Sequence, residues 1–322
     1  MDLSGKTILL TGGTGSFGNA FVERVRSTWP DAVVRVFSRD ELKQSEMRAR
    51  FGDDGVRYMI GDIRDRGRMT RAAQGADVLV HAAAMKQVPA CEYNPFEAVR
   101  TNVLGAQHVV DAAIDAGVPK VVALSTDKAV NPVNLYGATK LCAEKITVQG
   151  NAYAAHSDTR LSCVRYGNVL GSRGSVVPLF KAQAEQGGLT ITDDRMTRFW
   201  ITLSQAVDLV LYALDNMAGG EVFIPKIPSM RVVDLAEAMA PGIPIRVTGI
   251  RPGEKLHELL LTSDESRHSI DAGDVYVVLP EHPWWENPKR WVDGKPLDDG
   301  FVYASDSNAE WLDVDALRAL VS

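Results

Sequence analysis

The segment TILLTGGTGSFG, residues 7–18, decides the fold, because a short apolar run leads directly into glycines spaced three residues apart. The run at residues 7–10 predicts a buried strand, and the residues after the glycines predict a helix. Such glycines permit a tight turn and bring backbone N–H groups onto a pyrophosphate at the helix N-terminus. A glycine-rich turn without a ligand is the weaker alternative. The loop residues expected to contact a dinucleotide are Gly12, Thr14, Gly15, Ser16, Phe17 and Gly18.

The rest of the first half repeats the same alternation of strand and helix. Longer helical patterns separate five more short runs rich in β-branched residues, at residues 33–37, 58–61, 78–81, 121–125 and 161–165. The alternation predicts an α/β fold, with helices covering both faces of a Rossmann-type, doubly wound parallel sheet. Ligands of such sheets bind beyond the carboxyl ends of the strands. The loops after these runs are therefore the expected site.

From about residue 171 the pattern loosens into shorter pieces, which predict a smaller C-terminal α/β substrate-binding lobe. We expect a cofactor domain over residues 1–170 and a substrate lobe with a C-terminal arm over 171–322. A helix is expected over 204–215, and the wider stretch 199–217, inside a segment near 199–225, looks like a helix that packs back on the first domain. Residues 280–303 predict an irregular arm. The other pieces expected in this half are strands at 190–192, 221–224 and 245–248 and a helix at 232–239.

Composition excludes several classes of protein. With 322 residues, 45% hydrophobic and 24% charged, the chain predicts a soluble globular protein. A net charge of −6 argues against nucleic-acid or anionic-membrane partners, and no apolar run approaches the ~20 residues of a membrane span. The three cysteines, Cys91, Cys142 and Cys163, are odd in number and lack metal-ligand spacing. They predict a reducing cytoplasm and no metal site.

The loops after the second and third runs indicate which dinucleotide binds. An NAD enzyme places an acidic residue against the adenosine ribose. Here the residues are Ser38, Arg39 and Asp40, with Lys43 nearby, and guanidinium geometry suits a 2′-phosphate. We therefore expect NADP; the alternative is that Arg39 is a solvated loop residue and Asp40 serves NAD. Asp62 is expected to accept from the adenine amine or to cap the next helix. Further cofactor contacts are expected from Ile63, Ala82, Ala83, Ala84, Lys86 and Tyr166.

Tyr136 and Lys140 lie one helical turn apart, so their side chains face the same way. The lysine and a nearby nicotinamide cation are both expected to lower the tyrosine pKa, so that the phenol takes a proton from a sugar hydroxyl while hydride leaves for the cofactor. Thr126 can share that hydroxyl. Lys128, if neutral, can remove the proton next to the resulting ketone, while Asp127, if protonated, helps a hydroxyl leave as water. The alternative for Asp127 and Lys128 is a surface ion pair.

These residues stand in longer motifs, including STDKAVNPVNLYGATK, HAAAMKQVPACEYNP, RYGNVLGSRGSV and RPGEKLHE. The chain resembles extended short-chain dehydrogenases/reductases, specifically the inverting UDP-N-acetylglucosamine 4,6-dehydratases, to about residue 280. Retaining dehydratases have Asp-Glu where this chain has Asp127-Lys128. The resemblance implies UDP-N-acetylglucosamine as substrate and UDP-2-acetamido-2,6-dideoxy-β-L-arabino-hexos-4-ulose as product. It also implies a homo-oligomer, a dimer or larger.

The nucleotide-sugar side is expected at loops of the second half. Arginine forks match diphosphate oxygens, although any single arginine is more often a solvated surface group. The residues expected to contact the substrate are Lys86, Asn168, Arg173, Val177, Arg198, Arg251 and Glu254.

Two rival functions remain open at this point. A UDP-sugar 4-epimerase needs Tyr136 but neither Asp127 nor Lys128, so a Lys128→Ala protein separates the two activities. A non-catalytic, NADP-sensing binding protein would give no 4-keto product from UDP-N-acetylglucosamine, and the intact Tyr136 and Lys140 argue against it.

Overall fold

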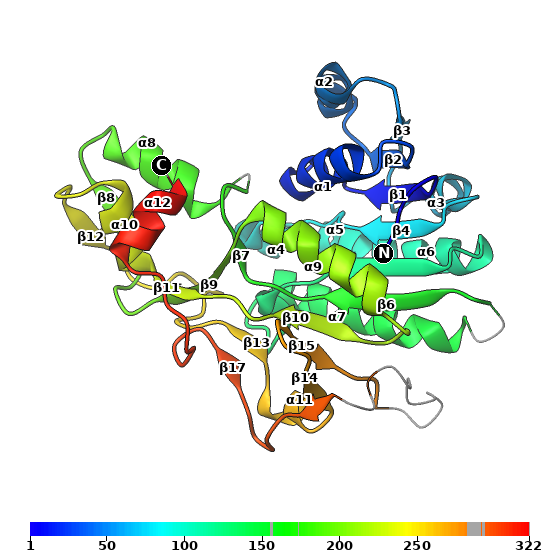
Figure 1. The fold of residues 1–322 in the computed structure, drawn as a ribbon. Helices are drawn as coiled ribbons and strands as arrows, with labels where there is room; N and C mark the ends of the chain where they lie inside the picture. Colours follow the sequence, from blue (N-terminus) through cyan, green and yellow to red (C-terminus); the bar gives the residue numbers. More distant parts are fainter. Residues whose placement is uncertain (155–156, 173, 282–290, 292–293, 322) are drawn as a thin grey trace.

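The computed structural model describes residues 1–154, 157–172, 174–281, 291 and 294–321. Within them, one sheet of ten strands forms the centre of the molecule (Figure 1). Seven neighbouring strands run parallel, and the last three alternate in direction. In spatial order the strands are β3(Val56–Ile60), β2(Val33–Ser38), β1(Thr7–Thr11), β4(Val78–His81), β5(Lys120–Leu124), β6(Arg160–Val164), β10(Val222–Pro225), β15(Val275–Val278), β14(Ser269–Asp271) and β16(Lys295–Pro296). The predicted doubly wound α/β fold is confirmed, because the first six strands follow the order 3-2-1-4-5-6.

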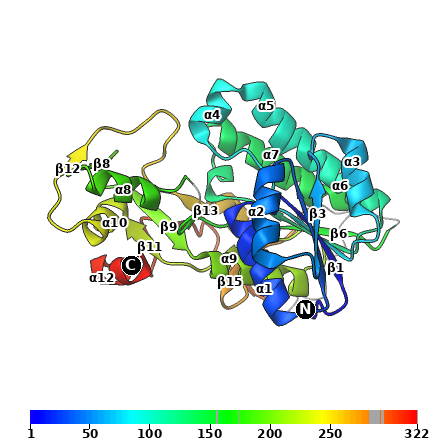
Figure 2. The ribbon, with the colours of Figure 1, turned by 90° about the horizontal axis from the view of Figure 1, so that it is seen from above.

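Helices cover both faces of this sheet (Figure 2). Strand β1 shows why: Ile8 and Leu10 belong to the core under α1 and α9, whereas Leu9 belongs to the core under α3 and α6. Successive side chains of a strand point to opposite faces, so a run that is apolar throughout is buried on both. The helices are α1(Ser16–Thr28), α2(Glu41–Phe51), α3(Arg66–Ala73), α4(Val88–Tyr93), α5(Pro95–Val99), α6(Gly105–Asp115), α7(Leu135–Gln149) and α9(Leu203–Asn216).

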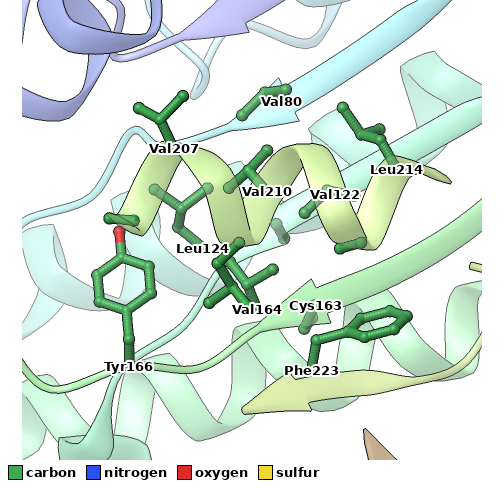
Figure 3. Packing of buried hydrophobic residues seen from close by; sticks show 14 of the residues in the cluster. Val80, Val122, Leu124, Cys163, Val164, Tyr166, Val207, Val210, Leu214 and Phe223 are labelled. Carbon is green, nitrogen blue, oxygen red and sulfur yellow. The ribbon is translucent and has the colours of Figure 1, made fainter. Parts of the chain in front are cut away.

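Helix α9 returns from the second half of the chain to the main sheet. It contacts α1, β5 and β6, and its Val207, Val210 and Leu214 lie in one core cluster with Leu124 and Phe223 (Figure 3). The predicted helix over 204–215 is confirmed within one residue at each end, whereas the wider prediction over 199–217 is wrong at its start. Residues 197–201 form strand β9(Thr197–Ile201), and the helix begins at Leu203 after an N-terminal cap at Thr202.

The remaining elements form a smaller lobe, which lies at the left of Figure 1. Its core gathers side chains such as Val177, Phe180, Leu235 and Leu317. Strands β7, β9 and β11 pair in one sheet, and β8 pairs with β12. The boundary of the predicted domains near residue 170 stays a prediction. The lobe contains β7(Asn168–Val169), α8(Val176–Ala184), β8(Leu189–Ile191), β9, β11(Ser229–Arg231), α10(Val232–Met239), β12(Ile245–Val247) and α12(Val314–Val321).

The described part of the segment that was expected to be an irregular arm packs against other elements of the fold. Trp291 is buried; its ring lies 5.9 Å from that of Phe223, and its Nε1 donates to Glu221. Farther on, β17(Tyr303–Ala304) pairs with β13(Leu259–Leu261). Trp284 and Trp285 lie outside the described residues. Among the described residues, no helix has the length and apolarity that crossing a membrane requires.

A buried ion cluster joins helix α7 to the C-terminal region. Arg165 follows β6 and is 1% exposed. Its guanidinium donates to Glu144 of α7 at 2.5 and 3.1 Å and to Glu265 of α11(Ser263–Ser266) at 2.8 and 3.1 Å. The Leu260 carbonyl accepts the remaining bond at 2.8 Å. All five N–H groups of this arginine are therefore engaged.

Candidate active site

A cavity of about 920 Å³ opens beyond the carboxyl ends of β1, β2, β4, β5 and β6 and extends to the smaller lobe. The glycine loop, the Ala82–Ala84 loop and the start of α7 form one side, and residues of β7 and β9 form the other. This is where ligands of doubly wound sheets bind. Its size suits a dinucleotide and the sugar end of a second nucleotide.

The glycine loop is shaped so that its backbone lies bare against the cavity. Gly12 has a φ of +68°, its N–H donates to Phe37 O at 2.8 Å, and a side chain there would lie 2.8 Å from Ala83. A Cβ at Gly18 would lie 2.1 Å from Gly13 O. Both positions exclude every residue except glycine. No side chain caps α1 at Gly15, so this described helix start presents its backbone and positive potential to the cavity.

The end of the cavity beyond β2 and β3 is expected to hold the adenine, and it carries acidic and basic groups. Asp40 caps α2 by accepting from Lys43 N, and it also pairs with Lys43 Nζ at 2.7 Å. Burial acts to raise the pKa of Asp62, but hydrogen bonds and charge from Arg64 outweigh it and leave the pKa lowered. Asp62 does not cap the next helix, which Asp65 does. Arg39 lies 3.7 Å from Asp62 with its side chain 58% exposed.

The start of helix α7 carries the expected phenol and amine. Asn134 caps this helix by accepting from Gly137 N, and Tyr136 and Lys140 are both buried and line the cavity. Lys140 Nζ donates to Leu124 O at 2.6 Å. Burial raises the pKa of Tyr136 to about 12, against the opposing charge of Lys128 and a hydrogen bond with Thr126. The expected lowering of this pKa by Lys140 is therefore wrong for the protein alone, because burial of the phenol dominates.

The turn Asp127–Ala129 follows β5 and brings the second pair of groups to the same place. Asp127 is fully buried; its Oδ1 accepts from Thr126 Oγ1 at 2.8 Å and from Lys128 Nζ at 3.1 Å. Lys128 Nζ also lies 3.4 Å from Glu258 Oε1. Burial acts to lower the pKa of Lys128, but the carboxylates of Asp127 and Glu258 outweigh it and leave the pKa raised. The pair joins a fully buried carboxylate to a partly buried amine at the cavity wall, so it is not a surface ion pair.

Comparison with known proteins places this geometry in a family. A profile of the family described as "Polysaccharide biosynthesis protein" matches residues 8–280. The chain belongs to that family. A curated relative from Campylobacter jejuni (serotype O:23/36, strain 81-176) called "UDP-N-acetylglucosamine 4,6-dehydratase (inverting)" is 48% identical over 96% of this chain and 95% of its own. A Rickettsia canadensis relative called "UDP-glucose 4-epimerase" is 43% identical over 90% and 87%.

Solved structures agree with the family assignment. Pen from Bacillus thuringiensis is 41% identical, with a TM-score of 0.91, covering 100% of this chain and 98% of its own. The dTDP-glucose 4,6-dehydratase DesIV from Streptomyces venezuelae, solved with NAD and TYD bound, shares the fold at 24% identity and a TM-score of 0.68, covering 78% and 86%. The resemblance to inverting dehydratases among the short-chain dehydrogenases/reductases is thereby confirmed.

In this member of the polysaccharide biosynthesis family, all residues expected around the cofactor line the cavity, including Ser38, Ile63, Ala84 and Tyr166. Of the residues expected to contact the substrate, Lys86 and Asn168 line it too. Asn168 of β7 is the cross-strand partner of Trp200 of β9.

Four other residues expected to contact the substrate are not among the residues that line the cavity. Arg198 is held by backbone carbonyls, with Nη1 donating to Thr197 O and Leu256 O and Nη2 to Lys255 O. Val177 packs in the lobe core, and Arg251 and Glu254 pair at 3.7 Å. Arg173 lies outside the described residues.

Several residues that line this cavity were not predicted from the sequence. Trp200 lines the cavity but was assigned to a helix, and Gln87, Ser172 and Ser175 had no pattern that set them apart. Glu258, for which the sequence left open a ribose contact or a helix cap, lies beside Lys128 instead. Within the described residues, no group of His, Cys, Asp and Glu side chains is arranged to hold a metal ion.

Proposed function

We propose that this protein is an NADP-dependent, inverting UDP-N-acetylglucosamine 4,6-dehydratase. The observation that carries the proposal is that Lys128, Tyr136 and Lys140 meet on one wall of a cavity whose other end is the glycine loop. The relative at 48% identity acts on this substrate according to its name, and its similarity spans nearly both chains. The glycine loop suits a pyrophosphate, because glycines at 12 and 18 allow a turn in which a Cβ would clash with the backbone of Ala83 or Gly13, and the uncapped start of α1 follows that turn.

The dinucleotide, when bound, supplies the oxidation of the sugar at C4 and the later reduction at C6, so no external reductant is consumed. Tyr136 takes the proton of the C4 hydroxyl, and Thr126 shares the hydrogen bond. Lys140 is held against Leu124 O, where its ammonium favours the phenolate once substrate and cofactor have displaced water.

The second stage is an elimination carried by Asp127 and Lys128. The raised Lys128 pKa means that the resting pair is ammonium and carboxylate. A proton passes over the 3.1 Å contact from Lys128 to Asp127, giving a neutral amine and a neutral acid. Lys128 then takes the C5 proton, and Asp127 donates its proton to the C6 hydroxyl, which leaves as water. Charges and protons balance, since the pair ends as it began.

We expect the reaction in heavy water to give a product that carries deuterium at C5 in the L-arabino configuration. The reason is that Lys128 takes the C5 proton on one face, and a donor on the opposite face, whose protons exchange with solvent, returns a deuteron to C5. NMR of the reaction mixture reads both the isotope and the ring couplings. A 4-keto-6-deoxy product that keeps the D-xylo ring would contradict inversion.

A second candidate, UDP-sugar 4-epimerase, is favoured by the Rickettsia relative of that name. An epimerase needs only the oxidation and its reversal at C4, so the buried Asp127–Lys128 pair would have no task. The same NMR spectrum separates the candidates, since epimerisation keeps the C6 hydroxyl.

We infer that the cofactor is NADP from Arg39, whose exposed guanidinium at the adenine end can pair with a 2′-phosphate. Asp40 supports this inference, because its carboxylate already caps α2 and pairs with Lys43. The Arg39→Ala protein should bind NADP about tenfold more weakly and NAD almost unchanged. Titration with both cofactors measures this, with Arg57→Ala, on the exposed side of β3, as the control. Equal losses for both cofactors would remove the case for phosphate recognition.

We also propose a cytoplasmic homo-oligomer, as the resemblance implies. The cysteines at 91, 142 and 163 are free in the structure, which suits a reducing compartment.

A further inference from the structure

Glu258 is a second carboxylate at the Lys128 amine. Its residue is 2% exposed, and its Oε1 lies 3.4 Å from Lys128 Nζ, while Asp127 Oδ1 lies 3.1 Å from the same nitrogen. The two carboxylates come from distant segments, one from the turn after β5 and one from the segment before β13. The amine is therefore bracketed from two elements of the fold.

Two further cations belong to this cluster. Arg198 Nε lies 3.7 Å from Glu258 Oε1, and Lys255 Nζ lies 3.7 Å from Glu258 Oε2. Both cations also donate hydrogen bonds to the backbone: Arg198 to carbonyl oxygens, and Lys255 Nζ to Val130 O at 2.5 Å. Of these charged groups, Lys128 is the one that lines the cavity. The cluster thus presents the Lys128 amine to the substrate space, and Asp127 lies directly behind the lining residues Lys128 and Thr126, from which it accepts hydrogen bonds.

The backbone of Glu258 is fixed by the C-terminal region. Glu258 N donates to Ser305 Oγ, and Ser305 N donates to Glu258 O, each at 2.9 Å. The Ser305 hydroxyl also bonds Thr197 of β9 at 2.7 Å. Glu258 is therefore held in place independently of the Asp127–Lys128 turn.

We propose that Glu258 is a positioning residue for the dehydration, holding the Lys128 amine at the cavity wall while the shared proton resides on Asp127. The inference rests on the proposed function. When Lys128 gives its proton to Asp127, the ion pair between them is lost, and a lysine amine without a partner is free to rotate. The Glu258 carboxylate still accepts from the neutral amine. Lys128 then takes the C5 proton and is again an ammonium between two carboxylates.

The charge of Glu258 also sets the pH range of this step. The charged and titratable groups around Lys128 are Asp127, Glu258, Arg198, Tyr136 and Lys255. Replacing Glu258 by glutamine removes a negative charge, so the ammonium of Lys128 is lost at lower pH. The alkaline limb of the dehydration rate should therefore move to lower pH. A merely structural glutamate would not move this limb.

The test compares Glu258→Gln and Glu258→Asp with wild type and with Glu265→Gln, which removes a buried, ion-paired carboxylate outside this cluster. Cofactor reduction is followed by absorbance in a single turnover with UDP-N-acetylglucosamine, and dehydration by NMR. We expect Glu258→Gln to reduce the cofactor within a few-fold of wild type and to dehydrate about 100-fold more slowly, with the alkaline limb shifted down. Glu258→Asp should keep the limb of wild type and lose less rate. Glu265→Gln should lose stability without separating the two steps.

Each of the remaining outcomes bears on one defined claim. Wild-type dehydration and an unmoved limb in Glu258→Gln would overturn the inference, as would equal losses of reduction and dehydration. If the Glu258→Gln protein does not fold, the Glu258→Asp protein decides the question. A wild-type dehydration rate in Glu258→Asp would overturn the inference, and a loss confined to dehydration would support it. A wild-type protein that yields no 4-keto-6-deoxy product defeats the proposed function instead.

Discussion

Replacing Lys128 by alanine is expected to leave a protein that oxidises the sugar but cannot dehydrate it. Tyr136 and Lys140 remain on α7, so the reduced nicotinamide should accumulate to about one equivalent when UDP-N-acetylglucosamine is added. Removal of the C5 proton loses its base, and general bases contribute about 10²–10⁴-fold to such steps. Absorbance of the reduced cofactor and NMR of the product measure the two stages separately.

The matched control is Lys226→Ala. Lys226 also pairs with a carboxylate, Asp271 at 2.8 Å, but it is not among the residues that line the cavity. It should behave as wild type in both stages. Dehydration by the Lys128→Ala protein at close to the wild-type rate would contradict the assigned role, and turnover to a C4 epimer would favour the epimerase.

Replacing Arg165 by methionine is expected to cost about 3–5 kcal/mol in the free energy of unfolding, the usual effect of removing one partner from a buried ion cluster. The change leaves Glu144 and Glu265 facing each other without their cation, and Leu260 O without its donor. Urea unfolding measures the loss. A difference from wild type below about 1 kcal/mol would show that the cluster contributes little.

A second variant and the pH dependence sharpen this test. Replacing all three charged residues with apolar ones of similar size should recover much of the loss, because no charge is then left buried alone. Burial acts to raise the pKa of Glu265, but Arg165 outweighs it and lowers the pKa from 4.5 to about 2. A lowered carboxyl pKa stabilises the fold above 4.5, and this contribution fades as pH falls toward 2. The gap between wild type and Arg165→Met should therefore narrow over that interval.

The sheet was predictable because its strands are apolar on both faces and are separated by helices. Each of the six early strands lies within two residues of its expected place. The error at β9 has a physical cause, since residues 199–201 are as apolar as the buried face of the helix that follows, and a strand this short shows no period of its own. A signal was present: Thr202 and Gln205 form a capping box, which marks a helix start at Leu203.

One end of the cavity could be predicted from the sequence much better than the other. The cofactor end follows from strand ends, which a parallel sheet brings to one edge, so Gly12, Arg39 and Asp62 were expected together. The other end is built by contacts between segments far apart in the chain, such as Glu258 against Lys128. No periodicity reports such a contact. The direction of the Tyr136 pKa was missed for a related reason, because burial depends on everything that packs around the phenol.

The path of the chain between sheet and lobe limits how this enzyme can be recombined with its relatives. After β7 and β9 in the lobe, the backbone returns to the sheet as α9 and β10, leaves again for β11 and α10, and returns once more as β14 and β15. A chimera with a single junction between two parent sequences would therefore take part of the sheet and part of the lobe from each parent. Grafting a new sugar preference therefore calls for exchanging short wall segments, such as those that carry Asn168 and Trp200, within an otherwise intact chain.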